Sequence, residues 1–260
     1  MTRVNVVTGS ASGIGLATKQ LLEARGERVI GVDLHEADVT VDLTTATGRD
    51  LLVEQVAAQS AGTLDAIFAI AGLSLPSPKT VAVNYFGMVA TLEGLRPLLA
   101  GSTAPRAVGV ASMASLQPTD HELVAALAAG DEATALARAE VLAAEPETTG
   151  ALIYASTKRA FAQWTRRSAI GSEWAGAGIP LNAVAPGVIQ TAMTADLTAT
   201  AEARAALLEL VPMPLNGIAD ADVVARLLAW LGGIENSHLC GQVVFVDGGS
   251  DAVIRGDATW

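Results

Sequence analysis

The sequence predicts an α/β fold in which one domain is built on a doubly wound parallel sheet. Short apolar runs rich in β-branched residues alternate with longer helical patterns, an order typical of parallel strands joined by right-handed crossovers. Hydrophobic residues make up 51% of the 260 residues and charged residues 17%, so most segments should be buried between layers. No linker or change of composition divides the chain, so residues 1–260 are expected to form a single domain.

The elements follow one another in a regular order. The expected strands are the β-branched apolar runs at 3–8, 28–33, 64–70, 106–111, 179–184 and 242–246, with a further short strand before Val41. The helices expected between them are at about 13–25, 45–59, 84–100, 152–175 and 219–232.

Residues at about 117–150 interrupt this alternation. They contain Ala-, Leu- and Glu-rich stretches at about 120–129 and 132–144, separated by Gly130 and ended near Pro146. We interpret the segment as an insertion of one or two helices into the α/β fold.

Composition argues against several classes of function. The formal net charge is −11 with acids spread along the chain, so binding to nucleic acid or to anionic lipid is not expected. No signal peptide or membrane-spanning run is recognised, and Cys240 is the only cysteine, so a reducing cytoplasm is the expected location. The three histidines are scattered without ligand spacing, so no metal site is expected.

Three glycines follow the first expected strand. Gly9, Gly13 and Gly15 lie directly before the helical run from Leu16. Glycines there allow a tight turn and close approach to a pyrophosphate, which the N-terminus of a helix attracts. The spacing is G-x-x-x-G-x-G instead of the generic G-x-G-x-x-G, but a strand and a helix are both in place. We therefore expect a Rossmann-type dinucleotide site and not a plain glycine-rich turn.

An acidic residue ends the second expected strand. Asp33 lies about twenty residues after the glycine loop, where a carboxylate can accept hydrogen bonds from the adenosine ribose. No Arg or Lys follows at once, so NAD(H) is expected over NADP(H), whose phosphate would be repelled; alternatively, Asp33 only caps the strand. Asp42 and Leu43 could flank the adenine, or Asp42 could open the next helix.

Tyr154 and Lys158 lie one helical turn apart, on the same face of an expected helix. A free phenol has a pKa of about 10. A nearby ammonium, together with the positive nicotinamide ring, could lower that pKa toward neutrality and make Tyr154 a general base.

These motifs occur in an order that resembles the short-chain dehydrogenase/reductase family over essentially the whole chain. The glycine loop is followed by Tyr-x-x-x-Lys at 154–158, by Pro-Gly-Val-Ile-Gln-Thr at 186–191 and by Val-Asp-Gly-Gly at 246–249. Within the family, the short path from Gly72 to Asn84 and the long insertion are similar to the bacterial 3α-hydroxysteroid dehydrogenase/carbonyl reductase group. Residues 69–72 are Ala-Ile-Ala-Gly where much of the family has Asn-Asn-Ala-Gly, so hydrogen bonds of those asparagines should be absent or replaced.

The resemblance implies roles for individual residues. Tyr154 would exchange the proton of the reacting alcohol and Ser112 would hydrogen-bond its oxygen. Lys158 would lower the Tyr154 pKa and hold the nicotinamide ribose, and Asn84 would position a water that links Lys158 to solvent. Thr191 would anchor the carboxamide. The expected NAD-binding residues are Gly9, Ser12, Gly13, Ile14, Gly15, Asp33, Leu34, Asp42, Leu43, Ala71, Gly72, Tyr154, Lys158, Pro186, Gly187, Ile189 and Thr191.

The segment after Thr191 is expected to form a lid helix that selects a hydrophobic alcohol or ketone, of hydroxysteroid, aryl or terpenoid type. Met193 and Leu197, with Ser112 and Tyr154, are the expected substrate contacts; further apolar residues are Leu207, Leu208, Leu210, Val211 and Met213. These residues could instead seal the lid or form a subunit contact. The insertion could likewise form an interface, or block the tetramer contact that the 152–175 helix commonly makes in the family, which favours a homodimer. The alternative to an enzyme is a catalytically idle redox sensor or scaffold that keeps the nucleotide site.

Overall fold

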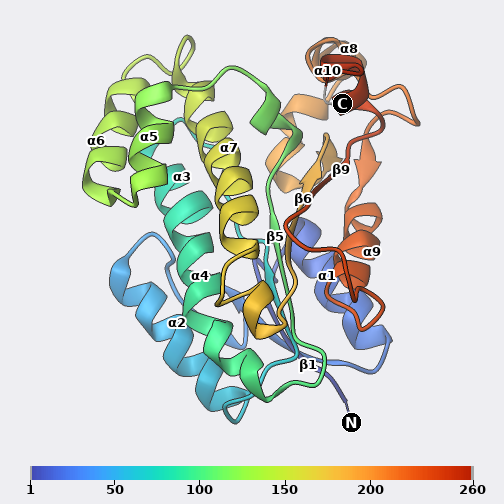
Figure 1. The fold of residues 1–260 in the computed structure, drawn as a ribbon. Coiled ribbons are helices and arrows are strands. Elements are labelled where there is room, and N and C mark those ends of the chain that lie inside the picture. The colour runs from blue at the N-terminus through green and yellow to red at the C-terminus, as the bar shows by residue number, and fades with distance from the viewer. Residues whose placement is uncertain (1, 259–260) are drawn as a thin grey trace.

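The computed structural model describes residues 2–258, and its centre is a parallel sheet (Figure 1). Within those residues seven strands pair in the order β3-β2-β1-β4-β5-β6-β9, every neighbour parallel. The strands of this sheet are β1 (Val4–Thr8), β2 (Arg28–Asp33), β3 (Val39–Thr40), β4 (Ala66–Ala69), β5 (Arg106–Val110), β6 (Leu181–Pro186) and β9 (Val243–Val246). The predicted doubly wound Rossmann-type fold is confirmed.

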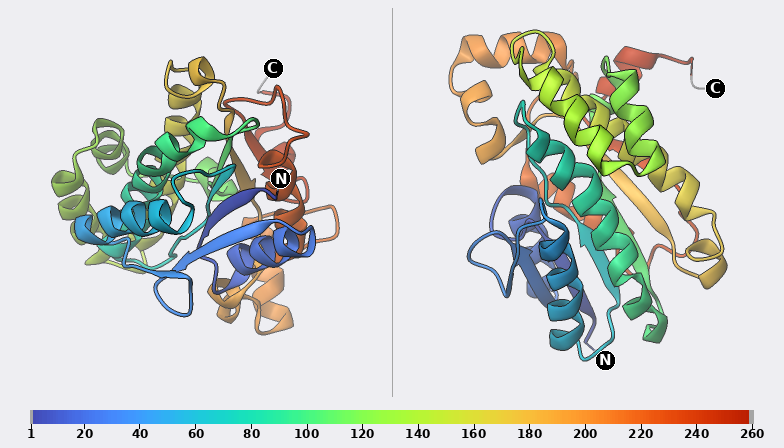
Figure 2. Two further views of the ribbon diagram at one scale, coloured as in Figure 1. Left: turned by 90° about the horizontal axis from the view of Figure 1, so that it is seen from below. Right: turned by 90° about the vertical axis from the view of Figure 1, so that its left-hand side faces the viewer.

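Helices cover both faces of the sheet, so its middle strands are buried on both sides (Figure 2). Successive strand residues face opposite layers: Val6 packs in the larger apolar core and Val7 in the smaller. The larger core includes residues of α2 (Ala46–Gln59), α4 (Met88–Leu95) and α7 (Gly150–Ala169). The smaller core includes residues of α1 (Gly13–Ala24) and α9 (Ala221–Leu231).

The helix expected over 84–100 begins earlier and is composite. Ser77 caps α3 (Pro78–Val81), with Pro78 in the first turn, where its missing N–H costs no hydrogen bond. A π-helical segment, η1 (Ala82–Gly87), follows and contains Asn84; α4 and the 3₁₀ segment η2 (Arg96–Gly101) complete the run. Such π-segments widen a helix by one residue per turn and are frequent at functional sites.

The insertion forms two helices, α5 (His121–Ala129) and α6 (Glu132–Ala143). Asp120 and Asp131 cap them through their side chains, and Gly130 separates them with φ of 71°. The buried face of α5 packs on α7 and α6 packs on α3. Figure 2 shows both helices beside the upper half of α7. The predicted helical insertion is confirmed, and of the one or two helices expected two form, separated at Gly130.

Some predicted boundaries are wrong by a few residues. The helix expected to end at 175 ends at Ala169, because the chain turns at Gly171, whose N–H bonds to the Ser168 carbonyl. The helix expected from 219 begins at Ala221, because Ala219–Asp220 forms β8 and pairs with β7 (Ile189–Gln190). Helix α8 (Ala201–Leu210) lies between β7 and β8, and helix α10 (Ser250–Arg255) follows β9.

Gly109 in β5 allows a test of core packing. A Cβ there would lie 2.4 Å from Cζ of Phe161 on α7. Helices α1 and α9, the latter with Ala229, cover the other face of the sheet. We expect Gly109→Ala to lower the free energy of unfolding by about 1–3 kcal/mol, because overpacking forces side chains off their rotamers. Urea denaturation measures it. Gly176→Ala, whose Cβ would meet its nearest atoms at 3.6 Å, is the control; equal stability of the two variants would contradict the expectation.

Candidate functional site

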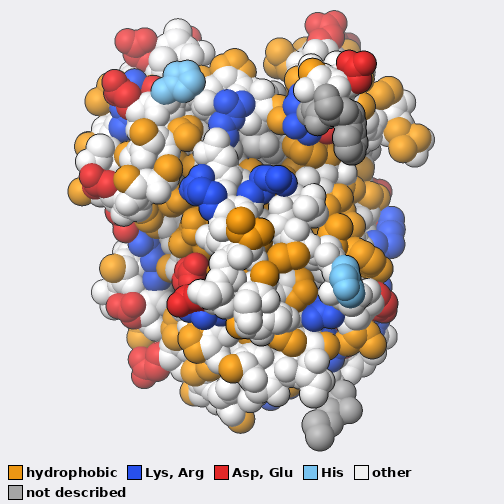
Figure 3. Space-filling model, in the orientation of Figure 1, with side chains coloured by type: hydrophobic (Ala, Val, Ile, Leu, Met, Phe, Trp, Pro, Cys, Tyr) orange, Lys and Arg blue, Asp and Glu red, His pale blue; other side chains and the backbone are white. Residues whose placement is uncertain are grey.

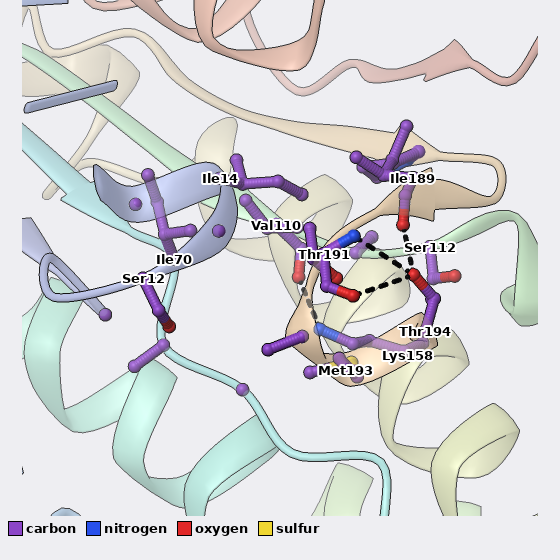
Figure 4. Close-up of a pocket in the computed structure, with 18 of the residues that line it drawn as sticks. Ser12, Ile14, Ile70, Val110, Ser112, Lys158, Ile189, Thr191, Met193 and Thr194 are labelled. Carbon is purple, nitrogen blue, oxygen red and sulfur yellow. Dashed lines mark hydrogen bonds between the residues drawn. The ribbon is translucent and has the colours of Figure 1, made fainter. Parts of the chain in front are cut away.

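A cleft lies across the carboxyl ends of the strands, where parallel α/β sheets bind ligands. Its volume is about 840 Å³ including space open to solvent. Figure 4 shows the side chains that surround it, and Figure 3 shows the surface above it notched between the insertion and the region of α8 and α10. Its lining residues are Gly9, Ser12, Gly13, Ile14, Gly15, Ile70, Ala71, Gly72, Val110, Ala111, Ser112, Tyr154, Lys158, Pro186, Gly187, Ile189, Thr191, Ala192, Met193 and Thr194.

The glycine loop forms one wall of this cleft and leaves the start of α1 open. A Cβ on Gly15 would lie 2.0 Å from the Gly9 carbonyl oxygen, and Gly9 has φ of 71°, so both positions require glycine. Ser12 is the N-cap but, within residues 2–258, its side chain makes no capping hydrogen bond. The first N–H groups of α1 therefore remain available to an anionic ligand, as predicted for a pyrophosphate.

Asp33 lies at the rim and braces this loop. One carboxylate oxygen accepts a hydrogen bond from the Ala11 N–H (2.9 Å), and the other accepts one from the N–H of the exposed Leu34 (2.7 Å). Neither Asp33 nor Leu34 is among the lining residues. Asp33 therefore ties the loop to the end of β2 and keeps its carboxylate near the surface.

Asp42 and Leu43 also lie outside the lining residues. Asp42 accepts hydrogen bonds from the N–H and hydroxyl of Thr44, which lower the pKa of its carboxyl group. Thr45, not Asp42, caps α2. The segment stays beside Asp33, however, since the Val41 N–H donates to the Asp33 carbonyl (3.0 Å). Asp42 thus orders a turn at the rim of the cleft.

Lys158 is buried at the centre of the site. The α7 helix carries both Tyr154 and Lys158 into the cleft, and Lys158 is 3% exposed. Its Nζ donates to the Val110 carbonyl at 2.8 Å (Figure 4) and lies 5.6 Å from the Tyr154 ring centroid. Burial lowers the pKa of Lys158 to about 7, because the charged form loses solvation.

The Tyr154 phenol is buried, and the lowering of its pKa expected from the sequence also requires the positive charge of the nicotinamide ring. Burial raises its pKa above the ordinary value of 10.0, and a hydrogen bond with Ser112 acts weakly in the opposite direction. Desolvation dominates because the phenolate would lose its solvation in the buried site. The chain alone therefore brings the acid and base groups together without ionising the phenol.

Asn84 and Thr8 hold the loop after β4. The Asn84 side chain accepts from the Leu73 N–H (2.7 Å) and donates to the Leu73 carbonyl (2.8 Å), while Thr8 Oγ1 accepts from the N–H groups of Ile70 and Ala71. Thr8 thus supplies loop contacts where the family's asparagines are missing. Asn84 is fully buried and its amide is engaged with the protein, so its side chain acts on the loop and not on solvent directly.

Sequence reasoning missed Thr194. Thr191 and Thr194 form a reciprocal capping box, in which each side chain accepts a hydrogen bond from the other residue's N–H. Thr194 also donates to the Ile189 carbonyl (2.5 Å; Figure 4). A threonine three residues after Thr191 was the available signal. The other missed lining residues, Ile70, Val110, Ala111 and Ala192, are apolar and gave no such signal.

The expected substrate-contacting residues separate into two groups. Met193 lines the cleft and is 48% exposed, whereas Leu197 is 55% exposed and is not among the lining residues. Val211 and Met213 are buried in a third apolar cluster with Met113 and Val188, and Leu207 and Leu208 pack against it; Leu210 is 72% exposed. Met213 also accepts from the Val188 N–H. Val211 and Met213, with Leu207 and Leu208, therefore fix α8 to the rest of the fold, while Met193 faces the site.

Residues 2–258 lack two further features. They contain no helix long and apolar enough to cross a membrane. They also contain no group of three or more His, Cys, Asp or Glu side chains arranged to hold a metal ion.

Comparisons with known proteins agree over nearly the whole chain. The sequence profile of the family described as enoyl-(acyl carrier protein) reductase matches residues 9–251. A 3-alpha-hydroxysteroid dehydrogenase/carbonyl reductase of Comamonas testosteroni is 35% identical over 256 residues, covering 96% of this chain and 97% of the relative. A cis-4-hydroxycyclohexanecarboxylate dehydrogenase of Sinomonas cyclohexanicum is 30% identical over 269 residues, with coverage of 96% and 97%. The crystal structure of the 3-alpha-hydroxysteroid dehydrogenase from Pseudomonas sp. B-0831 complexed with NADH matches with a TM-score of 0.88 and 39% identity, covering 98% and 99%.

Proposed function

Because the chain is an oxidoreductase of the short-chain dehydrogenase/reductase family, we propose that it interconverts a hydrophobic secondary alcohol and its ketone with NAD(H). One observation carries the proposal: a single cleft brings Tyr154, Lys158 and Ser112 together with the open N-terminus of α1. The cleft therefore combines a proton-transfer group with a place for a dinucleotide. Initial-rate assays that follow NADH absorbance with a panel of alcohols and ketones test the proposal.

The residues present fit a dinucleotide. Glycine at positions 9 and 15 lets the loop fold tightly over the start of α1, because a Cβ there would collide with the backbone of Ala71 or of Gly9, and the N–H groups at that helix start would bind the pyrophosphate. Gly72 and Lys158 lie where the nicotinamide ribose would bind, and the 186–191 segment with its Thr191–Thr194 capping box would hold the carboxamide. Bound NAD(H) would supply the acceptor or donor of hydride. The NADH complex of the 39% identical structure supports this assignment.

Proton transfer is assigned to Tyr154. In alcohol oxidation its phenolate would take the hydroxyl proton while Ser112 donates a hydrogen bond to the reacting oxygen. The buried phenol has a raised pKa in the chain alone, so its ionisation depends on positive charge that arrives with the oxidised dinucleotide and on protonation of Lys158. Asn84 holds the Gly72–Leu73 backbone against which Lys158 lies, since Nζ would be 3.7 Å from a Cβ on Gly72.

Cofactor choice gives a direct test of Asp33. We expect NADH to be preferred over NADPH, because a 2′-phosphate would meet the carboxylate at the end of β2. Asp33→Asn should raise kcat/KM with NADPH relative to NADH about tenfold, since a like-charge contact costs on the order of a kcal/mol or more and asparagine can still accept from the Ala11 N–H. Steady-state kinetics with both cofactors measure the ratio.

The neighbouring Glu36 is exposed, so Glu36→Gln serves as the control for loss of one acid near the rim and should leave the ratio unchanged. A wild-type preference for NADPH would contradict the role given to Asp33.

The substrate class is proposed as hydroxysteroid, aryl or terpenoid. Support comes from the alicyclic substrates in the names of the two relatives and from the apolar Met193 and Ile189 at the cleft. A panel drawn from these three classes distinguishes them. If none turns over while NADH binds, the catalytically idle redox sensor or scaffold becomes the better explanation.

We also propose that the chain forms a homodimer. Within residues 2–258, β9 pairs on one side only, with β6, and its four residues are apolar and half-buried. The neighbouring α9 region exposes Trp230 and Ile234. Apolar sheet edges are normally covered. Sedimentation velocity should give twice the 26.5 kDa chain mass; a monomer or a tetramer would contradict this.

A further inference from the structure

We propose that Arg49 and Glu132 form a positioning pair through which the insertion orders the part of the site that receives the adenine half of the dinucleotide. The inference rests on the proposed function, because it assumes that NAD(H) binds in the cleft, and it takes up the expectation from the sequence that Asp42 and Leu43 flank the adenine. Neither residue of the pair lines the cleft. Both act through residues 42–44, which are called the rim segment below.

Arg49 is an unusually buried arginine. It belongs to the first turn of α2 and is 8% exposed. Its Nε donates to the Leu43 carbonyl (2.9 Å), and one terminal nitrogen donates to the Thr44 carbonyl (3.3 Å). The guanidinium thus binds the backbone of the two residues that follow Asp42, and it is the side chain that fixes their carbonyls.

The counter-charge comes from the insertion. Glu132, the first residue of α6, accepts from both terminal nitrogens of Arg49, at 2.8 and 2.6 Å. This two-bond geometry is the strongest that an arginine and a carboxylate form. Glu132 is separated from Arg49 by 83 residues of chain, so the contact joins the insertion to the cofactor-binding half of the fold.

The pair also contacts the π-helical segment that carries Asn84. The Arg49 guanidinium lies 5.8 Å from the Phe86 ring centroid. A Cβ on Gly87 would lie 3.1 Å from the Leu43 Cβ, so the rim segment packs directly on this segment. Arg49 is therefore held by Glu132 on one side and by Phe86 on the other, and both contacts fix where Leu43 lies.

A loosened rim segment would have to be ordered when the ligand binds. Each side chain that must be immobilised on binding lowers the affinity, by up to about tenfold. We therefore expect Glu132→Gln to weaken binding of the adenine half of the cofactor about 3- to 10-fold. Removal of a negative charge would by itself strengthen the binding of an anionic ligand. The expected weakening therefore has the opposite sign to the effect of charge alone.

The experiment titrates the purified full-length variants with NADH, followed by fluorescence, and with ADP-ribose, followed by calorimetry. ADP-ribose carries the adenine half without the nicotinamide. Glu132→Gln should raise both dissociation constants by the same factor and raise the KM for NAD⁺, while kcat at saturating NAD⁺ stays within about twofold. Arg49→Lys, which keeps the charge but loses the fork, should weaken ADP-ribose at least as much.

Glu122→Gln is the matched control. Glu122 lies in the same insertion, its side chain is 75% exposed and it pairs with Arg138 at 3.2 Å. Its substitution therefore removes the same charge without changing a contact of the rim segment. Its ligand affinities should equal those of the wild type. If Glu132→Gln also binds ADP-ribose as tightly as the wild type, the pair has no positioning role. If the wild type binds neither ligand, the proposed function itself fails, and this inference fails with it.

Discussion

Tyr154→Phe should reduce kcat by about 10²- to 10⁴-fold, the usual contribution of a positioned general acid or base. The reason is that phenylalanine keeps the ring beside Lys158 but has no hydroxyl to exchange a proton with the substrate. The ring contact with Lys158, 5.6 Å from its centroid, is preserved, so the NADH dissociation constant should stay within about twofold. Initial rates at saturating cofactor and substrate, with a parallel NADH titration, separate the two effects.

The chain offers a matched control for this change. Tyr85 is its other tyrosine, is buried, and is not among the lining residues. Tyr85→Phe removes the same atom from a buried ring and should leave kcat within about twofold. Turnover of Tyr154→Phe at the wild-type rate would remove Tyr154 from the mechanism, whatever the substrate.

Lys158→Met should produce the second large effect, in which activity and stability change in opposite directions. Activity should fall by about 10²-fold or more, because Tyr154 loses the neighbouring ammonium that favours its phenolate. The ligand-free protein should at the same time become more stable, because burial of a charged Lys158 is unfavourable and methionine has a similar length without charge. Initial rates and urea denaturation measure the two effects.

The gain in unfolding free energy expected for Lys158→Met over the wild type decreases as the pH rises. Lys158 has a pKa of about 7 in the folded protein and an ordinary value of 10.5 when unfolded. Between these values the unfolded state binds more protons, so the stability of the wild type rises with pH. Below about pH 7 the lysine is charged in both states and its burial destabilises the fold fully; above about pH 10.5 it is neutral in both.

The advantage of Lys158→Met in unfolding free energy should therefore be largest at about pH 6 and should shrink steadily toward pH 10. Lys79→Met alters an exposed lysine and should show no such trend. A constant difference between Lys158→Met and the wild type across this range would mean that Lys158 keeps an ordinary pKa.

Much of the site was predictable because its signals are local. Gly9, Gly13 and Gly15 required only a strand before them and a helix after them, and a phenol four residues before an ammonium must share a helical face. The two insertion helices were predictable for the same reason, since their acidic caps and Gly130 are adjacent in sequence to the turns they control.

The features that could not be predicted depend on contacts between distant segments. The Asn84 amide lies on a π-helical segment and bonds to Leu73, eleven residues earlier in the chain, so its partner is set by the path of the loop between them. The separation of Met193, which faces the cleft, from Met213, which anchors the lid beneath Val188, depends on the small β7–β8 sheet. The periodicity of apolar residues alone does not distinguish one that faces the cleft from one that is buried in the core.

By itself, the sequence determined the fold class, the order of the elements and the identities of the groups gathered at the carboxyl edge of the sheet, because patterning and turn residues act locally. The tertiary structure decided the electrostatics and the couplings. Desolvation raises the pKa of Tyr154 and lowers that of Lys158, because the fold buries both side chains where their charged forms lose solvation. The fold also brings Arg49 against Glu132, which lies 83 positions later in the sequence. A buried charge requires an opposite charge beside it, and the sequence alone does not show which residue supplies it.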